Sequence, residues 1–358
     1  MVLRFVTACL VHAAGAWELR GPEDQPTGTT IEPSAWFVAA PAPAGTVVTD
    51  PVALAAVAEQ TLRYLRAAHG VDPAADGGLF TALGVTDARM ERTLELVIDT
   101  ARAHPERLTD PDWLARTFEM WTWTPDPAEP KVKRWSLAPR SIRVTRYLTV
   151  QVEGRAAREE AYDQALWADP GAAARGRYTR RQVMEGAWQT GPDAGGAQAL
   201  VWLPEGAVHD ALMQGSVEVR FPDGHTTVYG VDVPNGIAYV PSKRGRDQDR
   251  FWYFRPLPGG PRGWGQPGLP DVQLQAGVTV AGDVYNLGLG RLVLLDHPDG
   301  AGGTTLRLAV LADSGGAFQP NLCQLDWYGG AFPSHAALYA AWKALPEHVG
   351  ARILVVRE

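Results

Sequence analysis

The segment 323–330 reads Cys323-Gln324-Leu325-Asp326-Trp327-Tyr328-Gly329-Gly330, an apolar strand pattern with one aspartate inside it. Two segments upstream have the same character: Val280-Ala281-Gly282-Asp283 and Leu311-Ala312-Asp313-Ser314-Gly315-Gly316-Ala317. Aspartate is uncommon in strands, and burying its carboxylate is costly unless the group is paired or hydrogen bonded. A single aspartate at a strand end commonly caps a turn. Three of them in one block of strands favour a shared acidic site instead.

A second cluster, of polar and aromatic residues, precedes this block. Amides, hydroxyls and aromatic rings suit a neutral sugar, because amides and hydroxyls pair with ring hydroxyls and apolar faces stack. Taken alone, each segment can also be interpreted as the ordinary polar residues of a strand or turn, without a binding role. The segments are Met213-Gln214-Gly215-Ser216, Tyr229-Gly230, Asn235-Gly236-Ile237-Ala238-Tyr239, Thr145-Arg146-Tyr147-Leu148-Thr149 and Tyr178-Thr179-Arg180.

The spacing of apolar residues predicts helices first and strands afterwards. Asp50-Pro51 starts a helix over 51–68, Asp87 caps one that runs to 104, and Asp110-Pro111 starts a third that extends through Phe118. The turn Phe221-Pro222-Asp223-Gly224 makes 216–231 a hairpin. We expect strands at 142–152, 199–203, 216–221, 225–231, 237–241, 277–282, 290–296, 304–312, 323–328 and 350–356, with one helix at 334–344. The fold class is therefore α+β, mostly β.

Composition excludes several classes of protein. The chain has 358 residues, of which 46% are hydrophobic, so two or three domains with packed cores are expected. The net charge of −7 argues against nucleic acid as the partner, since phosphate binding needs a basic face. The sequence holds no apolar run of the length that a membrane span requires. The two cysteines and eight histidines show no metal-ligand spacing, so we expect no metal and no cofactor.

The N-terminus has a weak resemblance to an export signal. Residues 1–16 contain one arginine and an apolar stretch that ends in Ala14-Gly15-Ala16. Val6-Thr7-Ala8-Cys9 is similar to a lipoprotein cleavage box, but eight residues ahead of the cysteine are too few for export. A wrongly assigned start codon or a buried first strand explains the pattern about as well, so whether Cys9 or Ala16 marks processing stays open.

Two other motifs do not carry the chemistry that they suggest. Asp313-Ser314-Gly315-Gly316 is similar to the nucleophile segment of chymotrypsin-like proteases, but the candidate histidine, His69, falls in a predicted helix and the strand order does not fit. Gly288-Leu289-Gly290 precedes a strand where a dinucleotide loop requires a helix N-terminus.

Taken together, the segments resemble the MltA family of lytic murein transglycosylases, over about residues 142–358. The resemblance rests on Gln214-Gly215-Ser216, the hairpin with Asp223-Gly224, Tyr229-Gly230 and Asn235-Gly236 with Tyr239, and on Asp283, Asp313 and Asp326 as the three aspartates of the family's C-terminal 3D domain. Tyr147 with Thr149 and Thr179-Arg180 are similar to two further stretches of the family. The sequence also departs from the pattern. Arg146 stands where the family has a glycine, and Leu148 where it has an aromatic residue. Phe318-Gln319-Pro320 replaces the turn that the family often has, and the stretch between Tyr239 and Phe251 is shorter than in the family.

The resemblance implies a double-ψ β-barrel domain with N-terminal helices, residues 1–142 plus 248–358, and an inserted β-barrel-like domain, residues 143–247. It implies cleavage of the β-1,4 bond between N-acetylmuramic acid and N-acetylglucosamine in peptidoglycan, leaving 1,6-anhydromuramoyl ends. Asp326 would be the single acid and base, with Asp313 and Asp283 as electrostatic or structural partners. The substrate-binding residues would be Thr145, Tyr147, Arg180, Gln214, Gly215, Ser216, Tyr229, Asn235 and Tyr239.

The partner would then be a glycan strand, bound by a monomer in the periplasm or cell envelope. Two alternatives remain open at this stage. The chain could be a glycan-binding wall protein without activity, or a glycoside hydrolase that uses two of the aspartates, which reducing ends among the products would identify.

Overall fold

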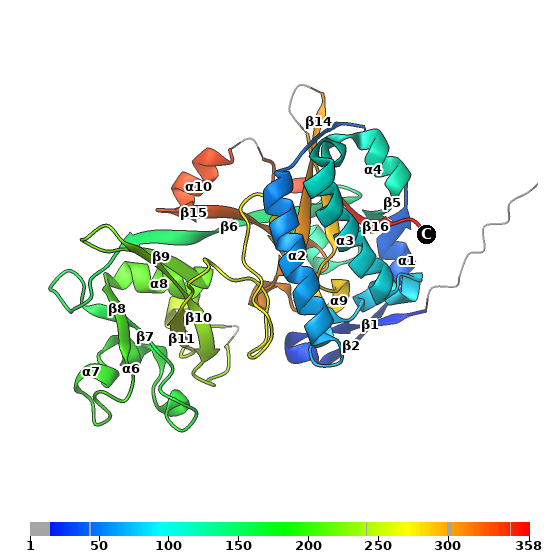
Figure 1. The fold of residues 1–358 in the computed structure, drawn as a ribbon. Coiled ribbons are helices and arrows are strands. Elements are labelled where there is room, and N and C mark those ends of the chain that lie inside the picture. Colours follow the sequence, from blue (N-terminus) through cyan, green and yellow to red (C-terminus); the bar gives the residue numbers. More distant parts are fainter. Residues whose placement is uncertain (1–14, 43, 241, 299–301, 344) are drawn as a thin grey trace, which may run out of the picture.

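A computed structural model describes residues 15–42, 44–240, 242–298, 302–343 and 345–358. The leader pattern around Cys9 lies outside the described residues. In Figure 1 the chain forms two lobes, one covered by the long helices α2 (Pro51–Ala68) and α3 (Asp87–Ala103) and the other built around α6 (Arg180–Met184) and α8 (Glu205–Gln214). Strands β6 (Ser141–Glu153) and β15 (Gln324–Phe332) run from the first lobe toward the second.

The first lobe contains a closed barrel of six strands. The neighbours in order are β6, β15, β12 (Thr279–Ala281), β14 (Thr304–Asp313), β13 (Leu292–Pro298) and β16 (His348–Val356), and β16 pairs back onto β6. Two of these contacts, β15 with β6 and β12 with β14, are parallel. The barrel therefore joins strands that are far apart in sequence, as a double-ψ topology requires.

Further strands extend the sheet beyond the barrel. The second half of β6 pairs with β9 (Ser216–Arg220), which continues into β10 (Thr226–Pro234) and β11 (Trp252–Pro256). On the other side β16 is followed by β5 (Phe118–Trp123) and β3 (Phe37–Ala39), and β4 (Thr46–Val48) pairs with β14. Two separate sheets consist of β1 (Trp17–Arg20) with β2 (Pro26–Ile31), and β7 (Gln164–Trp167) with β8 (Ala199–Leu203).

The remaining helices are short, and several start with proline at the first turn, where its missing N–H costs nothing. They are α1 (Pro33–Trp36), α4 (Pro111–Thr117), α5 (Pro130–Trp135), α7 (Ala187–Thr190), α9 (Val284–Leu287) and α10 (His335–Ala341). The longest helix, α2, has the predicted start, since the Asp50 carboxylate accepts the backbone N–H groups of Val52 and Ala53, both at 3.0 Å.

β6 belongs to two hydrophobic cores. Ile142 and Val144 from its first half pack into the large core that fills the barrel and the space beneath α2 and α3. Leu148 and Val150 from its second half pack into a smaller core with Val217 and other residues of β8, β9 and α8. A third cluster packs Trp188 with other aromatic side chains, among them Phe251 and, from β11, Tyr253. The strand thus fixes the barrel and the second lobe to each other.

Three sequence predictions need correction. The structure has no strand at 237–240, because the side-chain amide of Gln248 binds both the N–H of Val240 (2.9 Å) and its carbonyl (2.8 Å), in place of a partner strand. Thr86, not Asp87, caps α3 by accepting the N–H of Arg89 at 3.2 Å. The third helix ends at Thr117, and Phe118 begins β5, which pairs with β16. The hairpin at 216–231 is confirmed.

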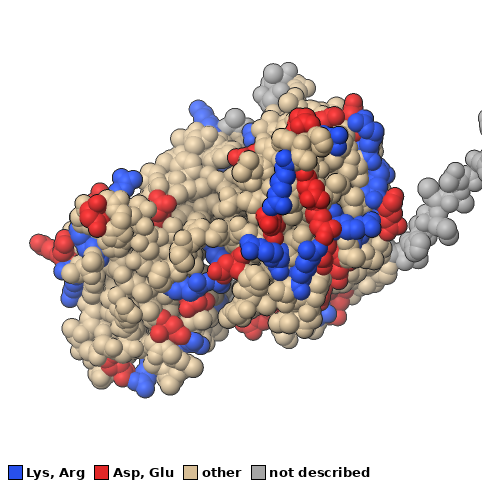
Figure 2. Space-filling view, in the orientation of Figure 1, with Lys and Arg blue, Asp and Glu red and all other residues tan. Residues whose placement is uncertain are grey.

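Charges are mixed on the face of the first lobe. Figure 2 shows basic and acidic side chains alternating over the helices, and the ion pairs Arg66–Glu91 (3.0 Å) and Arg102–Glu59 (2.6 Å) connect α2 with α3. Within the described ranges, none of the helices has the length and apolarity to cross a bilayer.

Candidate functional site

The neighbouring strands β6 and β15 bring predicted site residues onto one face. In their parallel register Asp326 is opposite Thr145, and Tyr328 is opposite Tyr147. Successive side chains of a strand point to opposite faces, so these four share a face while Leu325 and Trp327 turn into the barrel core. This surface, which also carries Gln324 and Arg143, is called the acidic face below.

Asp326 is held as a weak acid. The pKa of its carboxyl is raised to about 7, chiefly by burial and also by the nearby Asp313, against the opposing effects of Thr145, Arg143 and Arg146. Its Oδ1 atom is buried and has no hydrogen-bond partner among the described residues. A buried carboxyl oxygen without a partner is costly unless protonation or a ligand satisfies it. The group is therefore suited to give a proton to an incoming oxygen near neutral pH.

Asp313 lies next to Asp326 across a single strand. Ala281 of β12 pairs with Asp313 on one side and with Asp326 on the other, which separates the two Cα atoms by roughly 10 Å at the usual spacing of strands. The Asp313 carboxylate accepts the Tyr147 hydroxyl at 2.7 Å and the Ser314 N–H at 2.8 Å. Burial nonetheless raises its pKa to about 7. The pKa values of both carboxyls are therefore raised toward neutrality.

Hydroxyl groups connect the acidic face to the second lobe. The hydroxyl of Thr149 is hydrogen bonded to those of Tyr328 and Ser216, both at 2.9 Å. The ring of Tyr328 in turn packs on that of Tyr147, with centroids 5.2 Å apart. Ser216 is thereby linked, through Thr149 and Tyr328, to the tyrosine that holds Asp313.

The Gln214-Gly215-Ser216 segment forms the junction between α8 and β9. Gly215 ends the helix with a φ of +79°, a conformation that glycine adopts without strain. The Gln214 amide accepts the N–H of Leu148 at 3.3 Å and lies 3.0 Å from a ring nitrogen of His335 in α10. The segment thus lies beside the second half of β6, close to the hydroxyl network.

Asp283 has a different setting. It is fully buried and caps α9, and its two carboxylate oxygens accept the N–H of Asn286 at 3.2 Å, its side-chain amide at 2.8 Å and the N–H of Asn321 at 2.8 Å. Burial raises the pKa of Asp283 to about 6, against these donors. Both oxygens already have donors, so the carboxyl connects α9 to the segment before β15.

Replacing Asp283 by alanine is expected to lower the free energy of unfolding by roughly 3 kcal/mol, because buried donors of Asn286 and Asn321 would lose their acceptor. Urea unfolding at pH 7 measures the change. Asp99 lies exposed on α3, and Asp99→Ala is the matched control with an expected change within about 0.5 kcal/mol. Equal stability of the two variants would contradict a structural role of Asp283 in connecting α9 to the segment before β15.

Three other predicted residues lie in the second lobe, away from the acidic face. The Asn235 side chain is fully buried and bonds only to backbone groups, donating to the carbonyls of Tyr178 (3.0 Å) and Asp249 (3.1 Å) and accepting two N–H groups. Tyr229 packs in the core of this lobe. Tyr239 is 55% exposed. The structure does not bring these three to Asp326.

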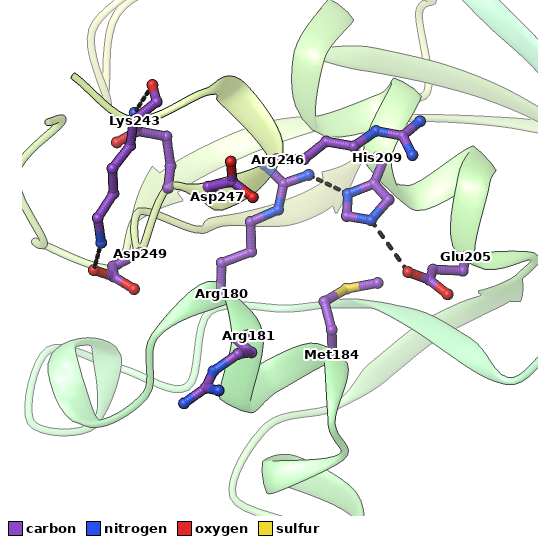
Figure 3. A pocket seen from close by; sticks show the side chains of 10 residues that line it. Arg180, Arg181, Met184, Glu205, His209, Lys243, Arg246, Asp247 and Asp249 are labelled. Carbon is purple, nitrogen blue, oxygen red and sulfur yellow. Dashed lines mark hydrogen bonds and ion pairs between the residues drawn. The ribbon is translucent and has the colours of Figure 1, made fainter. Parts of the chain in front are cut away.

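Arg180 lies at the start of α6 and lines a cavity of about 520 Å³ in the second lobe (Figure 3). None of the three predicted catalytic aspartates lines this cavity. Its other lining residues are Arg181, Met184, Glu205, His209, Lys243, Arg246, Asp247, Gln248 and Asp249.

Sequence reasoning missed three members of the acidic face: Arg143, Gln324 and Tyr328. Gln324 donates its amide to the Thr145 hydroxyl at 2.8 Å, and so helps to orient the residue beside Asp326. The sequence contains a signal for all three, because each lies an even number of residues from Thr145 or Asp326 on the same strand. Side chains at such spacing point to the same face of a sheet. Among the residues that the structure describes, no group of three histidine, cysteine or acidic side chains could hold a metal ion.

Comparisons with known proteins concern the fold. No family model matches the sequence, and no curated protein matches it. Solved structures do match. A membrane-bound lytic murein transglycosylase from Agrobacterium tumefaciens is 17% identical, with a TM-score of 0.58 over 86% of this chain and 92% of that chain.

Two further structures give similar values. MltA from E. coli with bound chitohexaose is 16% identical, with a TM-score of 0.59 over 90% of this chain and 95% of that chain. MltA from Neisseria gonorrhoeae is 15% identical, with a TM-score of 0.52 over 90% and 95%. The chain therefore has the fold of MltA-type lytic murein transglycosylases, and the predicted fold class is confirmed.

Proposed function

We propose that this chain is a peptidoglycan lytic transglycosylase that acts with Asp326 as its only acid and base. The observation that carries the proposal is the Asp326 carboxyl, which has a buried oxygen without a partner among the described residues and a pKa raised to about 7. The fold shared with lytic murein transglycosylases supports the reaction class, and the chitohexaose complex of one of them supports a glycan as substrate.

The proposed reaction adds no water. Protonated Asp326 gives its proton to the glycosidic oxygen that leaves with C4 of N-acetylglucosamine, and the bond from that oxygen to C1 of N-acetylmuramic acid breaks. The resulting carboxylate takes the proton of the C6 hydroxyl of the same muramoyl residue, whose oxygen then bonds to C1. Because the attacking hydroxyl belongs to the substrate, its effective molarity is high and a second carboxylate is not required.

The parts proposed for the neighbouring residues follow from their contacts. Asp313, near enough to raise the pKa of Asp326, would keep that acid protonated and is itself oriented by Tyr147. Thr145 and Tyr147 would contact the sugar beside the cleaved bond, and the Gln214-Gly215-Ser216 segment would bind a sugar farther along β6. Asp283, Tyr229 and Asn235 would support the fold, given their burial and contacts.

The division into a domain of residues 1–142 plus 248–358 and an inserted domain of residues 143–247 is part of the proposal. The separate hydrophobic cores support it, with β6 connecting the two. We also propose that the protein acts in the periplasm or cell envelope, because its substrate lies outside the cytoplasm. It would act there as a monomer.

The products of murein digestion test the function. The purified protein is expected to release soluble muropeptides with 1,6-anhydromuramoyl ends, each 18 Da lighter than a hydrolysis product because one water is not added. Reducing ends would show a glycoside hydrolase that uses two of the aspartates, for which Asp313 is the candidate second carboxylate because of its place beside Asp326. Binding without soluble products would show a glycan-binding protein. Either result overturns the proposed reaction.

A further inference from the structure

The cavity of about 520 Å³ in the second lobe contains a buried cation without an acidic partner. Arg180 is 7% exposed and forms no ion pair with any described residue, whereas the structure pairs many other arginines with carboxylates. One amino group donates to the carbonyl of Gly245 at 2.8 Å, and its Nε–H is buried without a partner among the described residues. A buried charge is costly unless it is paired, so an anion would relieve this arrangement.

His209 does not supply that anion. The Arg180 guanidinium can only donate, so Nδ1 of His209 must accept its hydrogen bond, and the other ring nitrogen carries the proton toward Glu205 at 3.4 Å. Burial, with Arg180 and Arg246 nearby, lowers the pKa of His209, so the ring is neutral. Figure 3 shows this chain of side chains along one wall of the cavity.

The acidic residues of the cavity are exposed or half-buried and have partners of their own. Asp249 pairs with Lys243 at 2.6 Å, Asp247 with Arg244 at 3.5 Å, and the side chains of Glu205 and Asp247 are largely exposed. Arg246 lies close enough to lower the pKa of Arg180. Arg180 is therefore the buried charge of the cavity, and the exposed charged residues around it carry both signs.

We infer that this cavity binds a short zwitterionic peptide, with a carboxylate against Arg180 and Arg246 and an ammonium group near the exposed carboxylates of the cavity. Two guanidinium groups match a carboxylate in charge and in hydrogen-bond geometry. The volume lies within the range of small-molecule pockets, roughly 300–1,000 Å³. A neutral sugar, in contrast, would leave the charge of Arg180 unpaired.

The inference rests on the proposed function in one respect, since the peptide stem of peptidoglycan carries carboxylate and ammonium groups of this kind. The cavity would then bind the peptide stem of a glycan chain whose sugars lie on the acidic face. Arg180 would contribute to peptide recognition and not to sugar contact.

Isothermal titration calorimetry with alanylalanine tests the site on the full chain. One dipeptide is expected to bind per protein, at least about tenfold more tightly than the C-terminal amide of the same dipeptide, which lacks the carboxylate. Arg246→Gln, at an exposed position, is expected to weaken binding several-fold without the folding risk of changing Arg180. Arg220→Gln, at an exposed position of the same lobe outside the cavity lining, is the matched control with unchanged binding.

The alternative results contradict the inference in distinct ways. Equal binding of dipeptide and amide, or an Arg246→Gln variant that binds like the Arg220→Gln control, would exclude recognition of the carboxylate by the cavity. Tighter binding of inorganic phosphate than of the dipeptide would show a simple anion site. Cleavage of chitohexaose, which has no carboxylate, is measured in parallel. Lost peptide binding with retained cleavage overturns only this inference, and the reverse overturns only the proposed function.

Discussion

The Asp326→Asn variant is expected to release anhydromuropeptides from murein on the order of 10²–10⁴-fold more slowly than the unchanged protein. Asparagine has nearly the same shape as protonated aspartate, but it cannot give up a proton at neutral pH and cannot take one back from the C6 hydroxyl. Both halves of the proposed reaction are lost together. The rate of soluble product formation, followed by chromatography and mass spectrometry, measures the effect.

Stability separates a chemical loss from a folding loss in this variant. The asparagine removes the cost of ionising a buried carboxyl whose pKa is raised to about 7, so Asp326→Asn should unfold no earlier than the unchanged protein above pH 7. Asp99→Asn, on the exposed face of α3, is the matched control and should keep full activity. Turnover of Asp326→Asn close to that of the control would show that the acid is another group.

The Asp313→Asn variant is expected to lose activity mainly at high pH. Asp313 raises the pKa of Asp326, and neutral asparagine at this position would lower it. The reaction needs protonated Asp326, so the alkaline limb of the pH dependence of kcat/KM should move to lower pH. The ratio of activity at pH 5 to that at pH 8 should rise several-fold, while the Tyr147 hydroxyl can still donate to the amide oxygen at residue 313.

A uniform loss of activity at all pH values would contradict the proposed role of Asp313 in raising the pKa of Asp326. It would indicate that Asp313 takes part directly in bond cleavage. Such a loss, together with reducing ends among the products, would favour the two-carboxylate hydrolase. A profile unchanged in both height and position would mean that Asp313 and Asp326 do not interact in solution.

Much of the site could be predicted from the sequence, because its strands have clear signals. The alternation of apolar and polar residues over 142–152 and 323–328 predicts two strands, and both are present. The unusual position of Asp313 and Asp326 within apolar strands marked them as candidates. Strand pairing could not be predicted, because nothing local to 324–328 specifies that it pairs with 143–147, about 180 residues earlier.

The rest of the candidate set depends on what each side chain contacts, which residue type alone does not reveal. Asn235 and Gln214 are both amides in polar segments, yet Asn235 bonds only to backbone and Gln214 reaches β6 and α10. Arg180 looks like a sugar ligand in the sequence, but it lines a separate charged cavity. The prediction of a strand at 237–241 is wrong at 237–240 for the same reason, since a glutamine side chain occupies the hydrogen-bonding groups of Val240.

The central claim is that Asp326 meets the bond to be cleaved on the acidic face. A crystal structure of Asp326→Asn with a bound chito-oligosaccharide tests it most directly, because the variant retains the uncut glycan. The account predicts sugars across Thr145 and Tyr147, with one glycosidic oxygen about 2.6–3.2 Å from the side chain of residue 326. A glycan seated elsewhere, with no glycosidic oxygen within reach of that side chain, would contradict the account.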